Sequence, residues 1–252
     1  MNYFFGMKYK SYISNLTIPK FSNQKPLNKN IKLYCAVIRN KKWFFFETRC
    51  KQDLNFFYLN SKFIDNEKIF FLATAKEIQK QINCDRLIKL NNFTDTNPEY
   101  RCNFEIRKKN YGFSSYQSEY GYKMTTIQGS LVSSLYLLTQ NNLNNLLIFK
   151  NIFHFPVMER FTGYIVDAEK KKILDEVNLF TNKTNIIKLD KNWIKKSLYF
   201  CTKKYSGIPI YLIDDRGHLS FEHTHPPQTY ISKDKNKVVK FYKEKVLSII
   251  KI

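Results

Sequence analysis

The stretch "YRCNFEIRKKNYGFSSYQSEYGY", from Tyr100 to Tyr122, carries the clearest strand pattern in the chain. In its first half Cys102, Phe104 and Ile106 alternate with charged and amide side chains, which is the period of a β-strand with one buried face. The residues "NYG" then supply a turn, and the second half returns as a partner strand. The stretch therefore predicts an antiparallel pair with one face in solvent.

Short apolar runs separated by polar turns continue on both sides of this pair. Strands are expected at "IKLYCAVI" and "WFFFETR" before it, and at "FTGYIVD", "SLYFCT" and "IPIYLI" after it. Thr74 and Glu77 form the S/T-x-x-E capping box of a short helix. The pattern predicts an α+β, β-dominated fold: an antiparallel β-sandwich or open barrel, with a small mixed α/β N-terminal portion and a C-terminal amphipathic helix.

Changes in composition divide the chain into four segments. They are an irregular basic arm at 1–30, a small mixed α/β portion at 31–96, an antiparallel β-sandwich at 97–230 and a C-terminal helix at 231–252. The helix has Val239, Tyr242, Val246 and Ile249 on one stripe, with lysines elsewhere. Docking on the sheet, contact with an anionic membrane and binding of a partner protein are all compatible with this pattern.

The net charge of +21 invites a nucleic-acid interpretation, but the composition weakens it. Only 7 of the 42 Lys and Arg residues are Arg, the type that specific readers of nucleic acid favour. Lys, Asn, Ile, Phe and Tyr together make up 124 of the 252 residues, and A/T-rich codons encode all five. An A/T-rich genome would therefore produce a basic protein without selection for phosphate, and nucleic acid is an unlikely partner.

The cysteines and the apolar runs indicate the compartment. Five widely spaced cysteines without a C-x-x-C pair argue against a disulfide framework and a cysteine zinc site. No apolar run reaches the roughly 18 residues of a membrane span, and the start lacks the apolar core of a signal peptide. The expectation is a cytoplasmic protein without a transmembrane segment and of unknown oligomeric state.

Three of the four histidines lie in "DDRGHLSFEHTHPPQTY", from Asp214 to Tyr230. We expect a hairpin in which Asp214 to Gly217 form a bulged type I turn and the return strand alternates. Leu219 and Phe221 mark the core face, so His223 and His225 should continue that face to the rim of the sheet. This geometry suits either a polar pocket or a divalent metal.

The spacing from Gly217 to His225 is similar to the first half of the first cupin motif, G-x5-H-x-H. The similarity ends there, because Thr229 and Tyr230 stand where that motif has its glutamate. No cupin ligand or activity is therefore transferred. A metal site would need another carboxylate, and Glu119 is the candidate beside His223 and His225, as in facial triads of two histidines and one carboxylate.

The stretch "YGFSSYQSEYGY" is a second candidate site. Tyr116, Tyr120 and Tyr122 should share a face, with Gln117 and Glu119 on the other. An aromatic ledge near amide and carboxylate groups suits a sugar, whose ring stacks while its hydroxyls bond. Dinucleotide, phosphate-loop and G-x-S-x-G motifs are missing from the sequence.

These observations favour a binding or accessory module with a histidine-lined pocket for a small polar or carbohydrate ligand, and no cofactor is expected beyond a possible divalent metal. The alternatives are a metal-dependent enzyme that uses His223 and His225 as ligands, and a nucleic-acid-binding basic protein. Whether the chain is an enzyme stays open. The expected ligand-binding residues are His223, His225, Glu119, Gln117, Tyr116, Tyr120 and Tyr230.

Overall fold

The computed structural model of the chain describes residues 2–22, 25–26, 30–79, 83–89, 101–108, 111–135, 144–193, 198–223 and 235–250. Strands dominate these residues, and every pairing between them is antiparallel. A helix lies at the C-terminal end, as predicted. The strand-dominated, antiparallel character expected from the alternating patterns is therefore confirmed.

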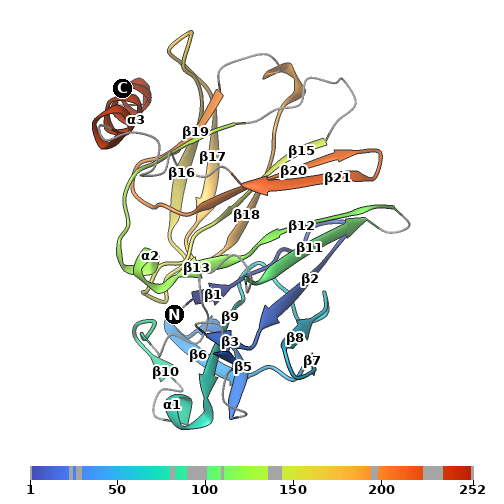
Figure 1. Ribbon diagram of the computed structural model, residues 1–252. Coiled ribbons are helices and arrows are strands. Elements are labelled where there is room, and N and C mark those ends of the chain that lie inside the picture. Colours follow the sequence, from blue (N-terminus) through green and yellow to red (C-terminus); the bar gives the residue numbers. More distant parts are fainter. Residues whose placement is uncertain are drawn as a thin grey trace.

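Two sheets build the lower body in Figure 1. Sheet 1 has the order β10 (Asn83–Cys84), β6 (Lys42–Glu47), β5 (Ile31–Arg39), β9 (Ile69–Thr74), β1 (Asn2–Phe4) and β13 (Glu119–Gly121). Sheet 2 has the order β12 (Phe113–Gln117), β11 (Asn103–Lys108), β2 (Tyr12–Pro19), β8 (Phe56–Leu59) and β7 (Lys51–Gln52). A two-stranded ribbon joins β3 (Phe21–Ser22) to β4 (Lys25–Pro26).

The upper body holds two further sheets. Sheet 3 has the order β14 (Leu131–Ser134), β19 (Leu198–Thr202), β16 (Arg160–Asp167) and β17 (Lys172–Phe180). Sheet 4 has the order β18 (Thr184–Lys188), β15 (Asn144–Lys150), β20 (Ile208–Asp215) and β21 (His218–His223). The helices are α1 (Ala75–Gln79), α2 (Tyr122–Thr126) and α3 (Lys235–Ile249), with a 3-10 turn at Lys191–Trp193.

The small sheets adopt a propeller-like arrangement, which is not clearly the predicted sandwich. The expectation of an irregular arm at 1–30 is also wrong, because β1 and β2 lie there as paired strands. β1 pairs with β9 and β13, and β2 pairs with β11, so strands from both sides of residue 97 share the same sheets. In β2 the buried positions do alternate, but one of them is polar: Ser14 is buried in line with Leu16 and Ile18.

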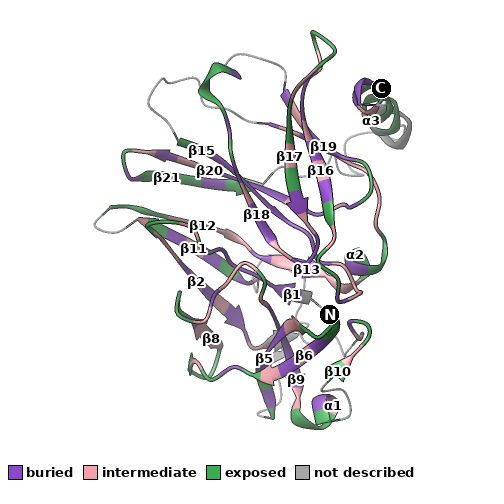
Figure 2. Cartoon of the chain, turned by 180° about the vertical axis from the view of Figure 1, so that it is seen from behind, coloured by how far each residue is buried: buried purple, intermediate pink, exposed green. Residues whose placement is uncertain are grey.

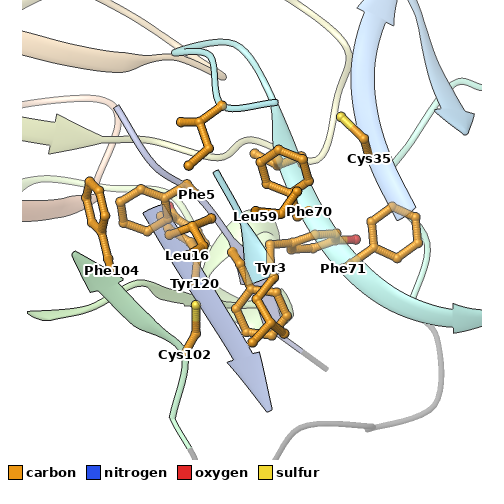
Figure 3. Close-up of a cluster of buried hydrophobic side chains, with 14 of the residues drawn as sticks. Tyr3, Phe5, Leu16, Cys35, Leu59, Phe70, Phe71, Cys102, Phe104 and Tyr120 are labelled. Carbon is orange, nitrogen blue, oxygen red and sulfur yellow. The ribbon is translucent and has the colours of Figure 1, made fainter. Parts of the chain in front are cut away.

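The two central strands of sheet 4, β15 and β20, are buried on both faces. Leu146 and Ile148 of β15 point into the core of the lower body, while Leu147 and Phe149 point into a second core shared with sheet 3. A strand covered on both sides reads as a continuous apolar run, which explains "LLIF" in the sequence. Figure 3 shows part of the lower core, where Phe5 and Phe104 come together.

The capping box predicted at the start of the short helix is confirmed. The Thr74 hydroxyl and backbone N–H both donate to Glu77 Oε2 at 2.8 Å, and Glu77 N–H donates to Thr74 Oγ1 at 3.3 Å. These bonds satisfy backbone donors that the first turn of a helix leaves open.

Helix α3 packs on sheet 3 through its last turns. Val246, Ile249 and Ile250 are buried against Val166 and Cys201, which supports the docking interpretation (Figure 2). The predicted stripe is wrong at Tyr242, which is 57% exposed. The helix therefore contacts the sheet through its C-terminal half.

Candidate functional site: the seam between β12 and β21

Two stretches that the sequence singled out separately lie side by side. β12 is an edge strand of sheet 2 and β21 is an edge strand of sheet 4, and the two strands pack against each other in both views (Figures 1 and 2). The rings of Tyr116 and Phe221 meet edge to face, with their centroids 6.5 Å apart. We call the meeting of these two strands the seam.

The hairpin of β20 and β21 confirms the predicted alternation. Leu219 and Phe221 turn inward, and Phe221 packs edge to face on Phe104 at 5.0 Å. The turn differs from the expected bulged type I, because Arg216 and Gly217 form a two-residue loop with φ of 51° and 104°. Two positive φ angles are typical of a type I′ turn, whose twist matches that of the strands.

The predicted histidine pocket falls largely outside the described residues. His223 is the last residue of β21, where its backbone lies opposite Ile210. His225 and Tyr230 lie outside the described residues. The pocket around these three residues therefore stays a prediction.

Tyr116 has charged groups of both signs close to its hydroxyl. Its side chain is partly buried, and burial together with the negative charge of Glu222 raises the pKa of Tyr116, while Arg101 opposes this shift. Gln117 lies one residue further along β12, and its Oε1 accepts a hydrogen bond from Arg101. Charges of both signs therefore act on the Tyr116 hydroxyl, and the same Arg101 also binds the Gln117 amide.

The predicted tyrosine ledge does not exist as such, because the chain leaves sheet 2 after Gln117. Ser118 is buried, accepts a hydrogen bond from Phe5 N–H at 3.0 Å and donates one to the Phe5 carbonyl. Tyr120 follows on β13, where it is 0% exposed and burial raises its pKa to about 12. A fully buried ring offers no face to a sugar, so Tyr120 drops out of the ledge.

Glu119 also lies on β13, and its Oε1 accepts a hydrogen bond from Cys102 N–H at 2.9 Å. This bond ties the carboxylate to the start of the β11 segment. No group of three His, Cys, Asp or Glu side chains that could hold a metal occurs among the described residues. The site formed by His223, His225 and Glu119 therefore rests on the sequence alone.

Asp214, expected only as a turn residue, anchors the seam. Its carboxylate is 1% exposed and accepts hydrogen bonds from Tyr12 Oη at 2.6 Å, Lys108 Nζ at 2.8 Å and Gly217 N–H at 2.7 Å. Burial alone would raise the pKa of Asp214, but the bonds from Lys108, Tyr12 and Gly217 bring it below its ordinary value. The anchor thus joins the tip of the hairpin to β2 and β11 of sheet 2.

The chain matches no protein-family model, no curated protein and no solved structure. No helix in the described part of the chain is long and apolar enough to cross a membrane. Any functional assignment must therefore come from the chemistry of the molecule itself.

Proposed function

We propose that this chain is a binding module for a small polar ligand of the carbohydrate class, held at the seam. The observation that carries the proposal is the meeting of Tyr116 and Phe221 across two sheets, which joins an aromatic, hydroxyl-rich strand to the histidine stretch. Ligands commonly bind where separate structural units meet, because such places combine apolar surface with convergent polar groups.

The side chains at the seam suit the two surfaces of a sugar. The partly buried ring of Tyr116 is suited to packing against the C–H face of a pyranose. Glu222 is exposed beside it, and Arg101 holds Gln117 in a fixed position, so an acceptor and an amide are available for sugar hydroxyls. A second wall would come from His223 and His225 as the sequence predicts.

We expect the Tyr116→Ala variant to bind an oligosaccharide about five- to tenfold more weakly than the natural chain, because loss of one stacking ring removes roughly 1 to 1.4 kcal/mol. The protein is first screened on an array of immobilised oligosaccharides, and the best hit is then titrated by calorimetry. Tyr58→Ala is the matched control, since Tyr58 is a partly exposed tyrosine on β8 of the same sheet. Equal losses in both variants, or no saturable hit, would contradict the proposal.

The metal-dependent enzyme is separated from this proposal by a direct measurement. Protein purified without chelator is analysed for bound divalent metal, and His223→Ala is compared with His218→Ala, an exposed histidine of the same strand. A metal lost only from the His223 variant would favour the enzyme. Sugar binding that survives exhaustive chelation would favour the binding module.

A further inference from the structure

In Figure 1, β6 and β10 at the edge of sheet 1 lie well below β12 and β21, and so away from the seam. A hollow is present at this edge. It has a volume of about 380 Å³ and lies where the β5–β6 hairpin meets β10. Its lining combines two cations, two amides and one aromatic ring: Arg39, Lys42, Asn40, Asn83 and Phe44. This set differs from the seam in its charge, because it contains no carboxylate.

Arg39 and Phe44 form a stack on the wall of this hollow. The guanidinium carbon of Arg39 lies 4.6 Å from the centroid of the Phe44 ring, and Phe46 lies beside Phe44 with the ring centroids 6.0 Å apart. Arg39 is exposed, and within the described residues no carboxylate pairs with it. Its second face and its N–H groups thus remain available to a ligand.

The charge around the hollow is positive. Lys41 and Lys42 are exposed beside Arg39, and Lys42 forms an ion pair with Asp85, whose carboxylate lies 3.9 Å from the Lys42 ammonium. Both side chains of that pair are largely in solvent, at 53% and 82% exposure, so the pair holds Lys42 weakly. An anion entering the hollow would meet the two cations of its lining, Arg39 and Lys42.

We propose that this hollow binds a nucleotide unit, with its base stacked on the Arg39 guanidinium and its phosphate held by Lys42. Proteins recognise unpaired bases by stacking on aromatic rings and on guanidinium planes, and they hold the phosphate with basic side chains. The Asn40 and Asn83 amides each offer a donor and an acceptor to a base edge. Free nucleotides and single-stranded nucleic acid share this chemistry.

The test is a titration of the full-length protein with four probes: adenosine monophosphate, adenosine, inorganic phosphate and a single-stranded oligoadenylate. Adenosine monophosphate or the oligoadenylate should bind at least tenfold more tightly than adenosine or phosphate alone. If the oligoadenylate binds far more tightly than the monophosphate, with an affinity that falls steeply as salt rises, the source is a polymer. If adenosine monophosphate binds as tightly as the oligoadenylate, the ligand is a free nucleotide.

Arg39→Ala should weaken binding of the preferred probe at least tenfold, and Arg39→Lys should restore little of it, because lysine keeps the charge but loses the plane. Arg107→Ala is the matched control, since Arg107 also lies over a ring, that of Phe113 at 5.9 Å, but is paired with Glu105 at 3.0 Å. Tyr116→Ala should leave this affinity unchanged. The proposal is overturned if no probe saturates, if phosphate alone competes equally well, or if Arg39→Lys binds like the natural chain.

Discussion

The Lys150→Met variant should be more stable to unfolding than the natural chain, by about 3 kcal/mol at pH 7. Lys150 ends β15 and is 0% exposed, with its Nζ 3.3 Å from the Asn66 carbonyl and 5.8 Å from the centroid of the Phe5 ring. Burial lowers the pKa of Lys150 from an ordinary 10.5 to about 7, although the charges of Glu67 and Asp65 oppose the shift. The fold therefore carries an amine that it stabilises poorly when charged.

The magnitude follows from the size of this pKa shift. A fall from 10.5 to about 7 corresponds to about 4–5 kcal/mol of folding free energy lost to keeping the group buried. Methionine has a similar length and carries no charge. The variant loses the hydrogen bond to the Asn66 carbonyl, which reduces the gain in stability by roughly 1 kcal/mol. That carbonyl keeps a partner, because Thr184 N–H donates to it at 2.7 Å.

The stability advantage of Lys150→Met over the natural chain should depend on pH. Between pH 7 and 10.5 the unfolded chain holds a proton on Lys150 that the folded chain has released, so this residue makes stability rise with pH. The advantage of Lys150→Met should thus be greatest at pH 6 to 7 and shrink by roughly 1.4 kcal/mol for each pH unit above that. Urea unfolding at pH 6, 7, 8 and 9 measures it.

Lys188→Met is the control for this experiment. Lys188 lies on the adjacent strand β18 and is exposed, so replacing it should change stability little at any pH. A Lys150→Met variant that is less stable than the natural chain, or an advantage that does not change with pH, would show that the amine is stabilised in its charged form.

Local patterns were enough to predict the strands, because alternation and turn chemistry are encoded within a few residues. The return strand with Leu219 and Phe221, the capping box at Thr74 and the terminal helix all follow this rule. The partners of each strand are not encoded locally. β1 reads as an irregular start, yet it completes a sheet with residues 119–121, more than a hundred positions away.

The seam shows the same limit for function. Tyr116 and the histidine stretch each stood out by composition, but their contact depends on how sheets 2 and 4 meet. The basic hollow was missed because Arg39 and Phe44 belong to a hairpin that looks ordinary along the chain. Lys150 could have raised suspicion, as a lysine that closes an apolar run.

Asp214→Asn should destabilise the fold by about 3 kcal/mol at pH 7, because it leaves the Lys108 ammonium and the Tyr12 hydroxyl without their carboxylate. The Lys108 side chain is 26% exposed, so water compensates its ammonium only in part for the lost carboxylate. Lys108→Met together with Asp214→Asn should cost less than the sum of the two single changes. Because the anchor holds β21 against sheet 2, sugar binding at the seam should weaken as well.

The free energy of unfolding measured at low pH separates the loss of the Asp214 carboxylate from a general weakening of the hairpin. The pKa of Asp214 is lowered in the fold, so its stabilisation is present above its ordinary value of 3.8 and is lost as pH falls below it. The gap between the natural chain and Asp214→Asn should therefore narrow progressively in urea unfolding as the pH is lowered below 3.8. Asp215→Asn, one residue along, has no hydrogen bond to lose among the described side chains and should be nearly neutral. If Asp215→Asn matches Asp214→Asn, or if the gap persists in acid, the turn and not the buried carboxylate holds the seam together.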